Sequence, residues 1–146
     1  MKYRSGNVLV LLSLLVLVGC GINSQRNRLP SEIESAINSV ADDIAQERYD
    51  KIYDDASELW RQDVTREQSA EVFKTLRARL GKVENRSLHS ATEQQNSGGA
   101  LKGNVYIVAY QTKFELGEGM ETYTLVERNG HWLLARYLVN STALNQ

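Results

Sequence analysis

Tyrosines and carboxylates are the side chains in this sequence whose types suit proton-transfer chemistry. Four tyrosines, Tyr106, Tyr110, Tyr123 and Tyr137, lie in the second half of the chain. A carboxylate base in an apolar pocket, with a tyrosine opposite it, is what a small cavity enzyme of the isomerase or hydratase type needs. The tyrosines therefore keep an enzyme interpretation open, provided that a suitable acid exists.

The acidic residues near these tyrosines are poor candidates for that acid. Glu115, Glu118 and Glu121 gather around a glycine turn, where we expect side chains to be exposed, and Glu127 lies beside the tip of a predicted hairpin. The carboxylate of the enzyme interpretation is therefore unidentified, and we expect the tyrosines to pack in the core or at its rim.

Motifs for other site chemistry do not occur in the sequence. The two histidines, His89 and His131, have neither HxH nor HExxH spacing, and there is no G-x-S-x-G elbow or glycine-rich phosphate loop. The formal net charge of −1 gives no field that favours nucleic acid. We therefore expect no catalytic residue, no metal, no cofactor and no nucleic-acid partner.

Cys20 is the single cysteine of the chain, so it can form neither an internal disulfide nor a cysteine-rich zinc site. It follows a positively charged start, with Lys2 and Arg4, and an apolar run over residues 8–18. Such a start, an apolar stretch of about 7–15 residues and a small residue before the cut predict a secretory signal peptide. The run is too short to span a bilayer comfortably, because that takes about 20 apolar residues.

The segment Leu17-Val18-Gly19-Cys20 resembles the lipobox of bacterial lipoproteins. The resemblance implies that residues 1–19 are a cleaved signal peptide and that Cys20 becomes the lipidated first residue, anchored in the bilayer by its acyl chains. Two or more chains anchor stably where one is marginal. Residues 20–30 then form the lipidated cysteine and a flexible tether. Because Gly21 and not Asp follows the cysteine, the resemblance favours the outer membrane, facing the periplasm, in a Gram-negative cell.

The first half of the remaining chain has the apolar spacing of helices. Apolar residues from Ile33 to Leu59 predict a helix that either continues to about residue 60 or breaks near Tyr49. Ser31 and Glu34 fit a capping box at its start. A further helix is predicted from Thr65, with Gln68 in a second capping box, to a glycine cap at Gly81. We expect two or three helices.

The second half alternates as strands do. Strands are predicted over residues 83 to about 93, 105–116, 120–128 and 131 to about 142, with a mobile loop at 94–99. In the second of these, one face carries Tyr106, Val108, Tyr110, Thr112, Phe114 and Leu116. Asn129-Gly130 is a strong signal for a type I′ hairpin. Helices followed by strands indicate one α+β domain over residues 31–146, with the helices packed on an antiparallel sheet of about four strands.

Four segments of the chain together resemble the nuclear-transport-factor-two-like, or cystatin-like, families. They are YDKIYDDAS, VTREQSAEVFKTLRARLGKV, VYIVAYQTKFE and TLVERNGHWLLARYLVNS. The resemblance covers residues 31–142 and implies a sheet curled around the helices into a cone that often encloses a cavity. Five aromatic residues would then be core, or would line a pocket or a partner face: Tyr106, Tyr110, Phe114, Trp132 and Tyr137.

Basic side chains gather where the last predicted helix ends, at Lys74, Arg77, Arg79, Lys82 and Arg86. They could meet an anionic lipid, glycan or protein, or they could simply complement the helix dipole. Our hypothesis is a membrane-anchored envelope lipoprotein whose non-catalytic domain binds a protein, a peptide or a small apolar ligand, with an envelope protein as a partner. The alternative is the cavity enzyme described above.

Overall fold

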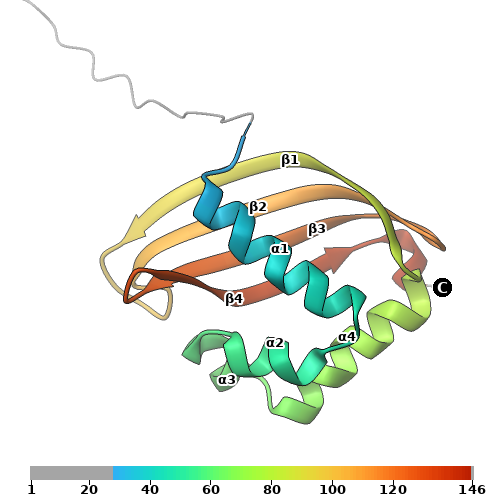
Figure 1. Cartoon of the computed structure of the whole chain (residues 1–146), viewed down its shortest axis with the longest axis horizontal. Helices are drawn as coiled ribbons and strands as arrows, with labels where there is room; N and C mark the ends of the chain where they lie inside the picture. The colour runs from blue at the N-terminus through green and yellow to red at the C-terminus, as the bar shows by residue number, and fades with distance from the viewer. Residues whose placement is uncertain (1–27, 146) are drawn as a thin grey trace, which may run out of the picture.

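A curved antiparallel sheet, with helices on its concave side, makes up the protein (Figure 1). The structure, a computed structural model, describes residues 28–145. The helices come first: α1 (Ser31–Ala45), α2 (Tyr49–Asp55), α3 (Glu58–Asp63) and α4 (Arg66–Leu80). The strands follow in the order β1 (Val83–Asn96), β2 (Gly103–Phe114), β3 (Gly117–Arg128) and β4 (His131–Asn140), and a 3₁₀ turn (Thr142–Asn145) comes last.

This architecture confirms the predicted α+β class with a four-stranded antiparallel sheet. The strands are neighbours in chain order, so each is joined to the next by a hairpin. The predicted signal peptide (residues 1–19), Cys20 and most of the predicted tether lie outside the described residues.

The first predicted helix breaks between α1 and α2, where the sequence analysis allowed a break. Glu47 takes a φ of 58°, which ends the α1 geometry, and the backbone N–H of Arg48 donates to the carbonyl of Asp43 at 2.8 Å. The buried Asp43 carboxylate also accepts from Arg48 Nε at 2.7 Å and from Lys51 Nζ at 3.3 Å. A second interruption at Ala56-Ser57 separates α2 from α3, so residues 28–145 form four helices and not two or three.

One of the two predicted capping boxes is wrong and the other is confirmed. The N-cap of α1 is Pro30, whose carbonyl accepts from the N–H groups of Ile33 and Glu34, so Ser31 is already helical and caps nothing. At α4, Thr65 Oγ1 accepts from the Gln68 N–H, and the Gln68 side chain accepts from the Thr65 N–H.

The β3–β4 hairpin has the predicted turn, with positive φ angles of 53° at Asn129 and 79° at Gly130. Several strand boundaries differ from the prediction, and two of them change which residues pair or face inward. β1 continues to Asn96, through part of the predicted loop, because it pairs with β2 as far as Asn96 opposite Gly103. β2 ends at Phe114, so Leu116 lies in the turn to β3 with 63% of its surface exposed, and it does not continue the inward face.

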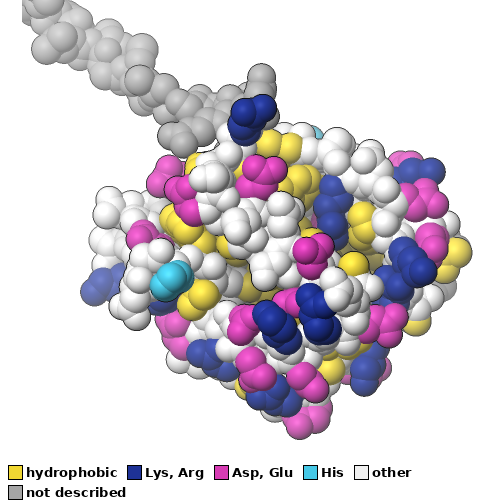
Figure 2. Space-filling model, viewed as in Figure 1, with side chains coloured by type: hydrophobic (Ala, Val, Ile, Leu, Met, Phe, Trp, Pro, Cys, Tyr) yellow, Lys and Arg dark blue, Asp and Glu magenta, His cyan; other side chains and the backbone are white. Residues whose placement is uncertain are grey.

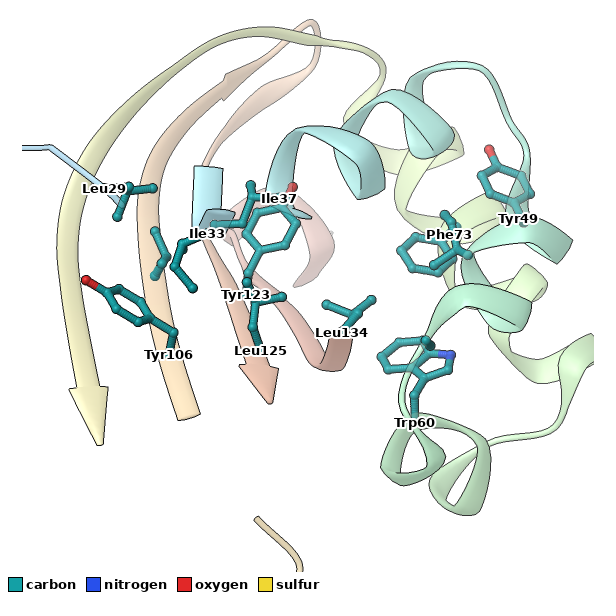
Figure 3. Packing of buried hydrophobic residues seen from close by; sticks show 13 residues of the cluster. Leu29, Ile33, Ile37, Tyr49, Trp60, Phe73, Tyr106, Tyr123, Leu125 and Leu134 are labelled. Carbon is teal, nitrogen blue, oxygen red and sulfur yellow. The ribbon is translucent and has the colours of Figure 1, made fainter. Parts of the chain in front are cut away.

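The main core has two parts (Figure 3). Ile33 and Ile37 of α1 lie against Tyr123 and Leu125 on the concave face of the sheet. Among the helices, Phe73 of α4 stacks with Tyr49 at a centroid distance of 5.8 Å and with Trp60 at 5.9 Å. Burial of such side chains stabilises the fold by roughly 1.5–3 kcal/mol each. Phe73 also contacts Tyr137 of β4, with ring centroids 5.4 Å apart, so the two parts meet over β4.

Candidate functional site

A buried carboxylate, Glu121 of β3, is the centre of a polar network on the concave face of the sheet. Its side chain has no exposed surface. Arg86 of β1, Thr112 of β2, Tyr123 of β3 and Tyr137 of β4 all donate hydrogen bonds to it. One side chain is therefore bonded to every strand of the sheet.

The network uses both oxygens of the carboxylate. Oε2 accepts from Arg86 Nε at 2.5 Å and from Thr112 Oγ1 at 2.9 Å. Oε1 accepts from Arg86 Nη2 at 2.9 Å and from the hydroxyls of Tyr123 at 2.8 Å and Tyr137 at 2.6 Å. The Arg86 guanidinium therefore grips Glu121 in the bidentate geometry that makes such pairs strong. Because a carboxylate offers about four lone-pair positions, these five donors leave it saturated.

The charges of the network hold each other in the ionised form. Burial alone would raise the pKa of Glu121. The hydrogen bonds and the charge of Arg86, together with the hydrogen bonds from Tyr137 and Tyr123, outweigh this effect of burial. The pKa of Glu121 is therefore lowered from its ordinary value of 4.5. Burial likewise disfavours the charged form of Arg86, and Glu121 overcomes it, so the pKa of Arg86 is raised. Burial and the neighbouring negative charge raise the pKa of Tyr137 well above 10.0.

A cavity of about 160 Å³ lies next to this network, between α1, α4 and the sheet. Figure 2 shows basic side chains among hydrophobic ones in the hollow between α1 and the strands. The lining of the cavity is mainly apolar, with three basic residues and one of the network tyrosines. The lining residues are Ala41, Ile44, Ala45, Phe73, Leu76, Arg77, Leu80, Gly81, Lys82, Val83, Arg86, Phe114, Tyr137 and Val139. Arg86 and Tyr137 thus join the cavity to the buried carboxylate.

The rim of the cavity is fixed where α4 ends. Gly81 takes a φ of 75°, as predicted for its capping position, and a Cβ there would lie 2.6 Å from Glu115 Oε2. The Lys82 N–H donates to that Glu115 oxygen at 2.7 Å, and the Glu115 N–H donates to the Lys82 carbonyl at 2.9 Å. The backbone that carries Lys82 is therefore tied to the β2–β3 turn.

A larger and more open groove of about 490 Å³ lies between α1, α2 and the β3–β4 hairpin. Its lining includes three acidic residues, Glu32, Asp43 and Asp55, and no Lys or Arg. It contains Trp132 but none of the Glu121 network. The charged residues that line the two hollows are therefore of opposite sign.

The five aromatic residues singled out from the sequence lie in three places. Phe114 and Tyr137 line the cavity. Tyr106 is buried in the core, with its ring edge-to-face against Trp132 at 6.0 Å, and Trp132 borders the acidic groove. Tyr110 is half-buried against Tyr123 at 6.1 Å, and burial raises its pKa.

The expectation that Glu121 is exposed in a glycine turn is wrong. β3 already begins at Gly117, so Glu121 lies within a paired strand, opposite Tyr110 of β2 and Val139 of β4. It shares the inward face of β3 with Tyr123 and Leu125, which are both buried. That alternation was the signal in the sequence, and the glycines around it obscured it.

The saturated carboxylate is poorly suited to acid–base chemistry. A general base needs a free lone pair and a pKa near the working pH, whereas Glu121 is fully bonded and its pKa is lowered. Among the described residues, no carboxylate lines the cavity. Within residues 28–145, no group of three or more His, Cys, Asp or Glu is placed to hold a metal ion, and no helix is long and apolar enough to cross a membrane.

Fold and site together define a small α+β domain. It has a mainly apolar cavity, with three basic residues in its lining, beside a buried ion pair. Residues 36–137, more than half of the chain, match the family described as Protein of unknown function (DUF4019), and the chain belongs to that family. No curated protein matches this chain.

Replacing Glu121 by glutamine should destabilise the domain, because it leaves the Arg86 charge without its buried partner. We expect a loss of about 3 kcal/mol in the free energy of unfolding at neutral pH, measured by urea denaturation. Glu118→Gln, an exposed change on the same strand, is the matched control and should alter it by less than about 0.5 kcal/mol. Equal effects of the two changes would contradict a structural role for the network.

The same variant should change the response to acid. Because the folded pKa of Glu121 is depressed, its contribution to stability is complete above the unfolded value, near 4.5, and is lost as the pH falls through the folded value. Wild-type protein should therefore lose stability below about pH 4.5 more steeply than Glu121→Gln does. Parallel acid profiles would argue against the ion pair.

Proposed function

We propose that this protein is a lipid-anchored protein of the bacterial envelope whose domain is a non-catalytic binding module for a small apolar ligand. The observation that carries the proposal is the cavity of about 160 Å³ between α1, α4 and the sheet. Its apolar walls would hold the ligand, and the saturated Glu121 network behind them gives the cavity a rigid polar edge but no free base. Pockets of this composition are typical of ligand sites.

The anchor is supported by the sequence of residues 1–20. A positively charged start, the apolar run over residues 8–18 and the likeness of Leu17-Val18-Gly19-Cys20 to a lipobox favour cleavage before Cys20 and acylation of that residue. The bilayer would then be a permanent partner, with the outer membrane facing the periplasm favoured in a Gram-negative cell. Residues 20–28 would tether the domain, because Leu29 is already buried in its core and Pro30 caps α1. Such a tether would let the domain reach an envelope protein partner.

The likeness to nuclear-transport-factor-two-like families adds support of a different kind. In those families helices cover the concave face of a curled sheet and a cavity often lies between the two layers. The cavity bounded by α1, α4 and the sheet has a comparable position, and two of the aromatic residues expected in a pocket, Phe114 and Tyr137, line it.

The anchor can be tested by metabolic labelling with palmitate in a bacterial host. The full chain should take up label, and Cys20→Ala should not, because it removes the sulfur and the processing site. Ser24→Ala, a change in the proposed tether, is the control and should label as the wild type does. Labelling of Cys20→Ala at the wild-type level would exclude the anchor.

The binding function can be tested with benzyl alcohol as a neutral apolar probe. The full ¹⁵N-labelled chain, held in zwitterionic lipid nanodiscs, should show saturable shifts of the Gly81 and Lys82 amide signals, with a dissociation constant of about 1 mM or tighter. Ala41→Leu should abolish them, because the added side chain fills the cavity.

Ala78→Leu makes the same change on the exposed face of α4, outside the cavity lining, and should bind as the wild type does. The binding function would be contradicted if the two amide signals did not respond, or if they responded equally in the Ala41→Leu variant.

A further inference from the structure

The lining of the cavity carries an excess of positive charge that the chain as a whole lacks. Three of the described residues that line it are basic, Arg77, Lys82 and Arg86, and none of them is acidic. The formal net charge of the chain is −1, and the groove on the other side of α1 is acidic. Basic residues are therefore concentrated at the cavity and do not reflect a generally basic surface.

Two of these charges are poorly compensated. The nearest carboxylate oxygen to Arg77 is that of Glu47, at 3.7 Å, and the Glu47 side chain is mostly exposed. The Lys82 ammonium makes no ion pair within residues 28–145. The Glu115 carboxylate accepts a hydrogen bond from the backbone N–H of Lys82 and not from its ammonium group. An anion entering the cavity would thus find positive charge that the described carboxylates neutralise only in part.

Arg86 contributes fixed donors in addition. Its charge is balanced by Glu121, and its Nε and Nη2 groups are both used in that pair. Its Nη1 group makes no hydrogen bond with a described residue. Because the bidentate pair locks the plane of the guanidinium, the remaining donors need no further ordering when a ligand binds.

The size of the cavity limits the occupant. An apolar protein cavity of about 150 Å³ holds one benzene molecule, so the 160 Å³ here suit an apolar body of about six to eight non-hydrogen atoms. Phe73, Leu80 and Val139 supply apolar walls for such a body. Long acyl chains exceed this space.

We propose that the ligand is a small organic acid, whose carboxylate lies at the basic rim while its apolar body fills the cavity. Lys82 and Arg77 attract the carboxylate, and Arg86, which lines the cavity, offers it the Nη1 donor that Glu121 does not use. This assignment rests on the proposed binding function and names the ligand class for the same site. Carboxylate and guanidinium have matching planar geometry, which favours this anion for the arginine donors.

The test compares three probes of nearly equal shape, benzoate, benzyl alcohol and benzylamine, on the full chain in zwitterionic nanodiscs. The Gly81 and Lys82 amide signals report binding. We expect benzoate to bind about tenfold more tightly than benzyl alcohol, because charged hydrogen bonds replace neutral ones, and benzylamine to bind most weakly.

Charge variants locate the preference. Lys82→Gln and Arg77→Gln should each lower the ratio of the benzyl alcohol to the benzoate dissociation constant about threefold, because each removes one positive charge from the lining. Lys74→Gln removes one positive charge from an exposed position on α4 outside the lining, and it should keep the full preference. Arg86 stays intact because its loss would unbalance Glu121.

The outcomes separate this inference from the binding function beneath it. If benzyl alcohol binds as tightly as benzoate, or benzylamine binds best, the organic-acid assignment is overturned while the binding function stands. If no probe binds, both are overturned. Dodecanoate is the fourth probe, and binding more than about tenfold tighter than benzoate would replace the small acid with a lipid acyl chain.

Discussion

The buried carboxylate of Glu121 is the interaction on which the concave face of this protein depends. A charge without exposed surface is costly unless it is paired and hydrogen-bonded. Here the compensation comes from one residue of β1, one of β2, one of β3 and one of β4. The requirement to satisfy a single side chain therefore fixes the relative positions of all four strands more specifically than apolar packing alone would do.

The same pair determines what the cavity would present to a ligand. Arg86 is held by Glu121 on one side and borders the cavity on the other, and Tyr137 spans the same boundary. α4 closes the opposite wall, because its last turn is tied to the β2–β3 turn through Gly81, Lys82 and Glu115. The ion pair and the end of α4 thus place basic side chains in fixed positions around the apolar cavity. Such an arrangement is better suited to binding a ligand than to transferring a proton.

Local patterns predicted the architecture well. Alternation in β2, the Asn129-Gly130 turn and the Thr65 capping box depend on residues close in sequence, and each is present, although the alternation ends at Phe114 and not at Leu116. The network was not predicted, because Arg86 and Glu121 are 35 positions apart and meet only through the register of three strands. Glu121 also stands among glycines that suggest a turn, and only its alternation with Tyr123 and Leu125 indicated the inward face. The five basic residues near the end of α4 were recognised as a group, but which of them border a cavity depends on how α4 packs on the sheet.

A double-mutant cycle between Arg86 and Glu121 tests most directly whether this ion pair organises the domain. The free energy of unfolding would be measured by urea denaturation for the wild type, Arg86→Met, Glu121→Gln and the double variant. We predict strong coupling, with Arg86→Met costing at least about 1.5 kcal/mol less in the Glu121→Gln background than in the wild type. Additive costs, equal within about 0.5 kcal/mol, would show that the two residues stabilise the protein independently and would contradict the account.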